Sequence, residues 1–189
     1  MSERDRSRWE GVHARRPSAD TAPAAFLVEH ADLLSPGRTL DLAAGSGRNA
    51  LFLAARGHRV LAADIAGAAL RRIRERNPAV DVVQVDLDRP CFRAASFDNV
   101  LCINFLDRRL LSSMVEWLRP GGGLLVDTFL IDQREIGHPR DPAFLLAHNE
   151  LLERMRDVRV LRYREGTVTE ESATSHRAGI VARRPPAKN

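Results

Sequence analysis

Residues 38–64 of the chain read Arg-Thr-Leu-Asp-Leu-Ala-Ala-Gly-Ser-Gly-Arg-Asn-Ala-Leu-Phe-Leu-Ala-Ala-Arg-Gly-His-Arg-Val-Leu-Ala-Ala-Asp. The apolar runs at 39–43 and 59–63 are typical of short strands buried in a parallel sheet. A glycine-rich turn at 45–47 follows the first run, and the Ala- and Leu-rich segment 49–56 predicts a helix. The stretch therefore predicts a strand–turn–helix–strand unit, around which the rest of the chain can be placed.

The chemistry expected of such a unit is nucleoside binding. An acid at the end of the second strand can accept hydrogen bonds from ribose hydroxyls, and Asp64 stands there, 19 residues after Gly45. Glycine in the turn lets a ligand approach the backbone closely. A dinucleotide site would carry G-x-G-x-x-G, but position 50 is alanine. An NAD-dependent oxidoreductase is therefore an alternative that the missing third glycine disfavours.

The residues Asp41, Ala43, Gly45 and Gly47 stand at alternate positions, and this pattern resembles motif I of the class I S-adenosylmethionine (SAM) methyltransferases. Many members of that family carry glycine where this chain has Ala43. The resemblance implies SAM as the cofactor, S-adenosyl-L-homocysteine (SAH) as the product, and no metal. The cofactor-binding residues that it implies are Asp41, Ala43, Gly45, Gly47, Asp64, Ile65, Asp86, Leu87 and Asn104.

Two later segments extend the resemblance, which covers about residues 24–183. Residues 97–100, Phe-Asp-Asn-Val, are similar to the opening of the family's fourth strand, and residues 118–122, Leu-Arg-Pro-Gly-Gly, to the approach to its fifth. Branches that methylate exocyclic amino groups carry Asn/Asp-Pro-Pro-Tyr/Phe after the fourth strand. Residues 104–107 are Asn-Phe-Leu-Asp, which argues against those branches.

The alternation of strand and helix patterns along the chain predicts an α/β fold that ends in an antiparallel hairpin. Beyond the opening unit, strands are expected at 80–85, 124–129, 158–164 and 175–183, and helices at 68–76, 110–118 and 143–155. The resemblance implies a single-domain Rossmann-like three-layer sandwich. Its seven-stranded, mostly parallel sheet would have the order 3-2-1-4-5-7-6, with the last strand antiparallel.

We expect three parts in the chain: an N-terminal arm or lid over 1–22, the methyltransferase domain over 23–183, and a disordered tail over 184–189. The start resembles that of tellurite-resistance and thiol methyltransferases, a small-molecule branch of the family. The residues that carry this likeness are Trp9, Glu10, Pro23, Phe26 and Leu27, whereas Val12 and His13 depart from the branch's pattern.

The acceptor side is less defined by the sequence. The irregular loop 131–142 leaves the carboxyl edge of the sheet, where open α/β folds place ligands, and is a second candidate for the lid. His13 and His138 are the candidate general bases, because a hydroxyl or amine acceptor would need one and a thiolate or selenide would not. Candidate substrate contacts are Trp9, Arg16, Phe105 and Arg140.

Composition limits the remaining classes. The chain has 189 residues, a net charge of +4 and a pI of about 10, yet aromatic residues make up only 5%. Arginines spread along the chain with few aromatics do not indicate a single-strand binding surface, so we expect no nucleic-acid partner. The sequence shows no membrane-spanning run, no signal peptide and no metal-ligand spacing, which favours a cytoplasmic protein with Cys91 and Cys102 as reduced thiols.

The sequence therefore predicts a SAM-dependent methyltransferase acting on a small molecule, with the acceptor atom (thiol, chalcogen, amine or hydroxyl) and the oligomeric state left open. The alternatives are an NAD-dependent oxidoreductase, a catalytically silent SAM-binding module and an RNA methyltransferase.

Overall fold

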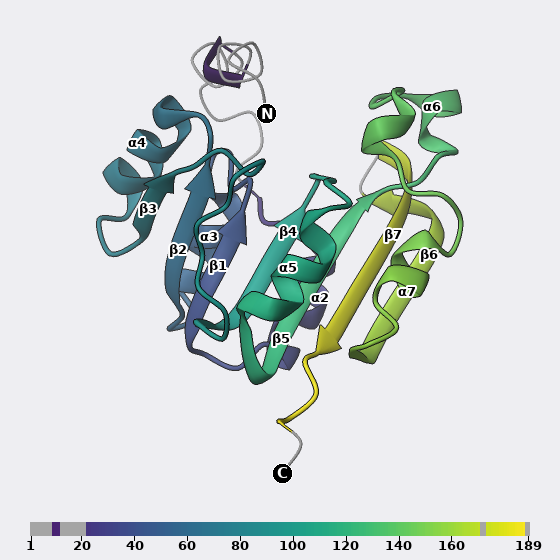
Figure 1. Cartoon of the computed structure of the whole chain (residues 1–189). Coiled ribbons are helices and arrows are strands. Elements are labelled where there is room, and N and C mark those ends of the chain that lie inside the picture. Colours follow the sequence, from purple (N-terminus) through teal and green to yellow (C-terminus); the bar gives the residue numbers. More distant parts are fainter. Residues whose placement is uncertain (1–8, 12–21, 171–172, 188–189) are drawn as a thin grey trace.

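The computed structural model describes residues 9–11, 22–170 and 173–187, and its strands and helices alternate along most of the chain (Figure 1). In chain order the elements are α2 (Ala25–His30), η1 (Ala31–Leu33), β1 (Arg38–Leu42), α3 (Arg48–Ala54), β2 (Arg59–Asp64), α4 (Gly67–Arg76), β3 (Asp81–Gln84), β4 (Phe97–Ile103), α5 (Leu110–Trp117), β5 (Leu118–Phe129), α6 (Gln133–Ile136), η2 (Pro142–Phe144), α7 (Glu150–Arg154), β6 (Arg159–Glu170) and β7 (Ala173–Arg183).

The strands form one seven-stranded sheet with the order β3-β2-β1-β4-β5-β7-β6. Strands β1 to β5 pair in parallel, whereas β7 runs antiparallel to both β5 and β6. This confirms the expected fold class and strand order. The order reverses between β1 and β4, and open α/β sheets bind ligands beyond the carboxyl ends of the strands at such a switch point.

Alternation along the central strands divides the core into two layers. On β1, Leu40 and Leu42 pack with α5 and α7 against one face of the sheet. On β4, Leu101 and Ile103 pack with α2, α3 and α4 against the other. Because successive strand residues point to opposite faces, a strand covered on both sides is apolar throughout. Buried polar residues interrupt this pattern, and Asp41 of β1 is one of them.

Several element boundaries differ from the expectations. The helix expected over 143–155 is wrong: that segment contains η2, an extended stretch and the short helix α7. The loop expected over 131–142 contains α6. The polar stretch 165–174 is not a long connection, because strand pairing between β6 and β7 continues to Glu170 and Ala173.

The end of the domain also differs. Arg184, expected in a disordered tail, exchanges backbone hydrogen bonds with Gly121 and Gly122. Its guanidinium donates to the carbonyl oxygens of Glu116 and Leu118, which fixes it to the end of α5. In the described part of the chain, no helix is long and apolar enough to cross a membrane.

The turn between β1 and α3 depends on a glycine that closes against α4. Gly47 has a φ of +78°, and a Cβ at this position would lie 2.4 Å from Cγ1 of Ile73, which is fully buried. Gly57, at the end of α3, has a similar φ of +83° but open space around it. The two glycines share the left-handed backbone and differ in packing.

We therefore expect Gly47→Ala to destabilise the protein far more than Gly57→Ala. Alanine with a positive φ costs about 1 kcal/mol at either position, and overpacking against Ile73 adds roughly 1–3 kcal/mol at Gly47 alone. Chemical denaturation of both variants measures the difference. Equal losses in the two variants would show that α4 does not close on the turn as described.

Candidate functional site

A cavity of about 280 Å³ opens at the carboxyl edge of the sheet, where β1, β2 and β4 end. It is lined by Trp9, Ala43, Ala44, Gly45, Ser46, Arg48, Asn49, Asp64, Ile65, Leu87, Ile103, Asn104 and Phe105. Its position at the switch in strand order is the one that open α/β folds use for ligands.

The floor of the cavity is fixed by the carboxylate of Asp64. Its Oδ2 accepts a hydrogen bond from the backbone N–H of Gly45 at 2.7 Å, and its Oδ1 accepts one from Ala66 at 2.8 Å. The residue is 6% exposed and lines the cavity. Each carboxylate oxygen can accept more than one hydrogen bond, so Asp64 can hold the turn and also meet a ligand's hydroxyl groups.

The turn itself has an unusual backbone. Gly45 has a φ of 53°, and Ala43 is also left-handed, with a φ of 52°. An alanine in this region is strained by about 1 kcal/mol relative to glycine. The position where the resembling family often carries glycine is therefore one whose backbone favours glycine.

A second acid, Asp41, lies beneath the turn. It is 1% exposed, and its Oδ2 has no hydrogen-bond partner among the described residues. Burial raises the pKa of Asp41 to about 7, and the negative charge of Asp64 contributes in the same direction. The backbone N–H of Ala50 and the guanidinium of Arg48 oppose the rise. A buried acid with an unpaired oxygen would be stabilised by a cationic donor.

The N-terminal segment reaches the opposite wall through Trp9 and Glu10. The carboxylate of Glu10 accepts hydrogen bonds from the backbone N–H groups of Gly67 at 2.7 Å and Ala68 at 3.2 Å. These N–H groups belong to the first turn of α4, whose N-cap residue Ala66 makes no side-chain cap. Glu10 therefore caps α4 from a distant part of the sequence and holds Trp9 at the cavity.

The end of β4 forms the third wall, with Asn104 and Phe105. Asn104 has a φ of 59°, and its backbone N–H donates to the carbonyl oxygen of Asp127 at 2.9 Å. Its side-chain Oδ1 accepts a hydrogen bond from Arg177 at 2.5 Å. The wall is thus fixed by neighbouring residues of β5 and β7.

The structure brings together most of the residues that the sequence predicted for the site. The predicted residues that line the cavity are Trp9, Ala43, Gly45, Asp64, Ile65, Leu87, Asn104 and Phe105. Asp41 lies below the floor, and Gly47 packs against Ile73. His13 and Arg16 lie outside the described residues.

Three predicted residues lie away from the cavity lining. Asp86 accepts a hydrogen bond from the backbone N–H of Asp88 at 2.9 Å, which lowers the pKa of Asp86. His138 and Arg140 are exposed on the segment after α6, and neither lines the cavity. Among the described residues, no group of three His, Cys, Asp or Glu side chains is arranged to hold a metal ion.

The sequence interpretation missed five lining residues, which are Ala44, Ser46, Arg48, Asn49 and Ile103. Ala44 and Ser46 lie within the predicted turn, so their position was an available signal. Asn49 is 6% exposed and its Oδ1 accepts a hydrogen bond from the backbone N–H of Ala24. The contact spans 25 residues, and no local pattern could have indicated it.

Comparisons with known proteins agree with this geometry. A family model described as a methyltransferase domain matches residues 39–122, which include β1 from its second residue, the glycine turn and Asp64. No curated protein sequence matches the chain. Similar solved structures exist in large number.

One similar structure is TehB from Haemophilus influenzae, at 23% identity and a TM-score of 0.74 over 87% of this chain. This chain spans 63% of the TehB chain. A protein studied for the conversion of a disulfide bond into a thioacetal group in echinomycin biosynthesis is 21% identical, with a TM-score of 0.74 over 96% of this chain and 93% of its own.

A third similar structure is a 1,6-didemethyltoxoflavin-N1-methyltransferase from Burkholderia thailandensis with bound SAH, at 22% identity and a TM-score of 0.63. The match covers 84% of this chain and 75% of that one. At these identities the likeness establishes the fold. The chain has the Rossmann-like fold of the class I SAM-dependent methyltransferases, and the methyltransferase-domain model matches its residues 39–122.

Proposed function

We propose that this protein binds SAM in the cavity at the ends of β1, β2 and β4 and transfers its methyl group to a small-molecule acceptor. One observation carries the proposal: the backbone N–H of Gly45 in the glycine turn donates a 2.7 Å hydrogen bond to Asp64. Both residues lie in the segment that matches the methyltransferase model. When bound, SAM would supply a methyl group activated by its sulfonium.

The acids of the floor fit this cofactor. Asp64 would accept hydrogen bonds from the ribose hydroxyls, as the acid after the second strand does in nucleoside sites. The buried carboxyl of Asp41 lies beneath the turn, where the positive charge of the methionine ammonium would stabilise its ionised form through space. SAM carries net positive charge, and two acids beneath the turn favour a cation.

The same features disfavour NAD. A dinucleotide site offers backbone N–H groups of the turn to a pyrophosphate, but the N–H of Gly45 already donates to Asp64. The engaged N–H of Gly45 and the missing third glycine thus favour SAM over the NAD-dependent oxidoreductase.

The chain's own residues can catalyse methyl transfer by positioning and by exclusion of water. Trp9, Leu87, Ile103 and Phe105 give the cavity apolar walls. Fixing the nucleophile in line with the methyl group can lower the barrier by several kcal/mol. The carboxylate of Asp64 lines the cavity but already accepts hydrogen bonds from Gly45 and Ala66. An acceptor that reaches the cavity already deprotonated would need no general base.

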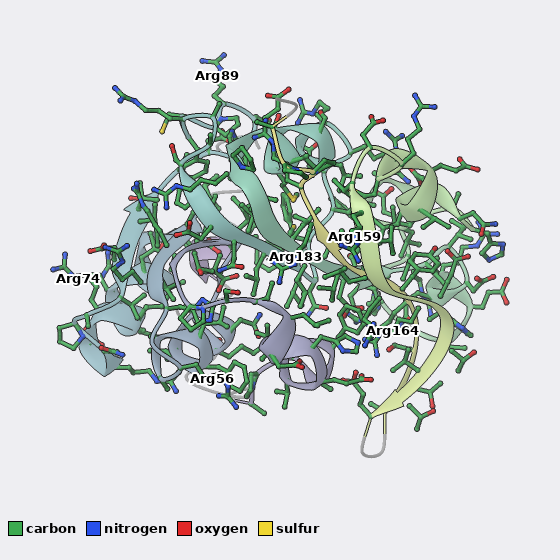
Figure 2. The ribbon with its side chains drawn as sticks, turned by 90° about the horizontal axis from the view of Figure 1, so that it is seen from below. Arg56, Arg74, Arg89, Arg159, Arg164 and Arg183 are labelled. Carbon is green, nitrogen blue, oxygen red and sulfur yellow. The ribbon has the colours of Figure 1, made fainter. Side chains whose placement is uncertain are left out.

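A small acceptor is supported by the volume of the cavity, about 280 Å³, and by the similar structure that holds 1,6-didemethyltoxoflavin together with SAH. Nucleic acid is a weaker candidate. In Figure 2, Arg56, Arg74 and Arg89 lie at separate edges of the molecule, whereas Arg159, Arg164 and Arg183 lie nearer one another on the side of β6 and β7. The labelled arginines are thus not gathered on one face, as the basic residues of a nucleic-acid surface are.

The direct test is calorimetric titration with SAM, SAH and NAD, followed by mass-spectrometric screening of small thiols, amines, hydroxy acids and chalcogen oxyanions with SAM. We expect SAM and SAH to bind, NAD not to bind, and one acceptor class to gain 14 mass units for each methyl group. Binding of SAH without turnover of any acceptor would favour the silent SAM-binding module. Methylation of RNA in preference to small molecules would overturn the acceptor assignment.

Asp64→Ala should weaken SAH binding by roughly 1.5–3 kcal/mol, because it removes a charged hydrogen-bond acceptor. Asp81→Ala is a matched control, since Asp81 is the first residue of β3 and therefore lies at the amino end of the parallel strands, away from the cavity at their carboxyl ends. Isothermal titration calorimetry of both folded variants gives the comparison. Unchanged SAH affinity in Asp64→Ala would remove this carboxylate from the cofactor site.

Asp41 should make ligand-free stability fall as pH rises. Its pKa of about 7 in the folded protein lies above its ordinary value of 3.8, so the folded state holds the proton more strongly. Its stabilising contribution is complete below pH 3.8 and is lost as pH rises towards 7. Between pH 4.5 and pH 8 the wild type should lose this contribution and Asp41→Asn should not. The unfolding free energy of Asp41→Asn relative to the wild type should therefore increase by roughly 2–4 kcal/mol over this range. Parallel pH profiles of the unfolding free energy would contradict this.

We also propose that Trp9 and Glu10 form a wall that covers the bound cofactor. The sequence has two tryptophans, Trp9 and Trp117, so the substitution Trp117→Phe leaves Trp9 as the single tryptophan whose fluorescence is measured. Glu10→Ala should then increase acrylamide quenching of Trp9 and cost about 1 kcal/mol of stability, the value of a helix cap. Glu75→Ala on α4 is the control. SAH should shield Trp9 only where Glu10 is intact; equal quenching in all variants would leave Trp9 outside the wall.

A further inference from the structure

The orientation of the Asn104 side-chain amide is set by Arg177, whose guanidinium can only donate hydrogen bonds. Nη2 of Arg177 lies 2.5 Å from Oδ1 of Asn104. A guanidinium has no acceptor atom, so the amide must turn its oxygen towards Arg177 and its Nδ2 group away. Asn104 lines the cavity and Arg177 does not. The end of the amide left for a ligand is therefore the donor, and Nδ2 makes no hydrogen bond to any described residue.

Arg177 is held so that it cannot release this amide. Its Nε and Nη2 donate to Oδ2 of Asp127 at 2.9 and 2.7 Å, and its guanidinium lies 4.4 Å from the centre of the Phe129 ring. Asp127 is 2% exposed, so its carboxylate depends on these partners. The chain from Asp127 through Arg177 to Asn104 thus fixes a hydrogen-bond donor at the end of β4.

The charge behind Asn104 also favours a negative ligand. Arg164 donates to Oδ1 of Asp127 at 3.0 Å, so two guanidinium groups share one buried carboxylate. Two further acids lie in this region. Glu170 is 3.7 Å from Arg164, and its side chain is 45% exposed, where solvent screens its charge. Asp107 is paired with Arg109 at 2.6 Å. The cavity therefore has a charged end at the turn, lined by Asp64 and Arg48 with Asp41 buried beneath, and a donor end at Asn104.

We propose that the Asn104 end binds a carboxylate or other oxyanion group of the methyl acceptor, so that the substrate is a small anionic molecule. This rests on the proposed function, and it narrows the acceptor class that the function leaves open. Asn104 was expected from the family resemblance to contact the cofactor. Here its side-chain Nδ2 group would instead donate to the methyl acceptor. The acids near Gly45 would hold the cationic cofactor, and the two ligands would meet between the two ends.

The test compares two thiols of equal length and opposite charge, mercaptoacetate and cysteamine, as probes of the SAH-loaded protein. Ligand-observed NMR titration gives both affinities. Wild-type protein should bind mercaptoacetate at least about tenfold more tightly, the factor expected from one hydrogen bond to a charged group. Asn104→Asp, which replaces the donor with an acceptor while tolerating a positive φ, should abolish or reverse this preference.

Asn149→Asp is the matched control. Asn149 has a φ of 63°, begins α7 and does not line the cavity, so this variant carries the same charge and the same backbone conformation. It should keep the wild-type preference. Asn104→Gly, which removes the donor without adding charge, should lose it, and unfolding midpoints confirm that each variant is folded.

The remaining outcomes overturn the inference. Wild-type protein that binds no mercaptoacetate or shows no preference contradicts it, as does a preference that survives in Asn104→Asp. A loss of SAH affinity beyond about threefold in Asn104→Asp would assign the donor to the cofactor's own carboxylate. Failure of wild-type protein to bind SAH is a separate result: it rejects the proposed function, and the inference falls with it.

Discussion

The hydrogen bond from Gly45 to Asp64 is the interaction on which the site depends. It joins the turn after β1 to the end of β2, so two neighbouring strands position one binding surface. The second oxygen of Asp64 accepts from Ala66, which also fixes the start of α4. Because the carboxylate is held by backbone groups of both connections, its position follows from the sheet and does not require a ligand to order it.

The cavity is polarised because its walls come from different parts of the sheet. The acids lie at the ends of β1 and β2, where the chain closes tightly and burial leaves Asp41 with an unpaired oxygen. The end of β4 carries Asn104, which is oriented by Arg177 of β7. Because β7 lies between β5 and β6, Arg177 of β7 sits beside β5, the strand next to β4. The antiparallel strand thus contributes to the site as well as to the core.

The N-terminal segment contacts the same helix, α4, whose N-cap residue Ala66 donates a hydrogen bond to Asp64. Glu10 satisfies two N–H groups at the start of α4, and Asp64 satisfies the one before them. Two acids at a helix N-terminus are stabilised by its dipole. The wall that carries Trp9 is therefore anchored to the floor of the cavity through one helix end, which gives a physical route by which cofactor binding and wall position can influence each other.

The α/β alternation, the glycine turn and the acid that faces it could all be predicted from the amino-acid sequence, because strand and helix periodicity and turn chemistry are local properties. The sequence also indicated Asn104 and Phe105 through their place after an apolar strand. Three features became visible in the folded chain: Oδ2 of Asp41 is buried with no partner among the described residues, Glu10 caps α4, and Arg177 orients Asn104. These contacts join residues up to 73 positions apart. They depend on strand order and burial, which no local pattern contains.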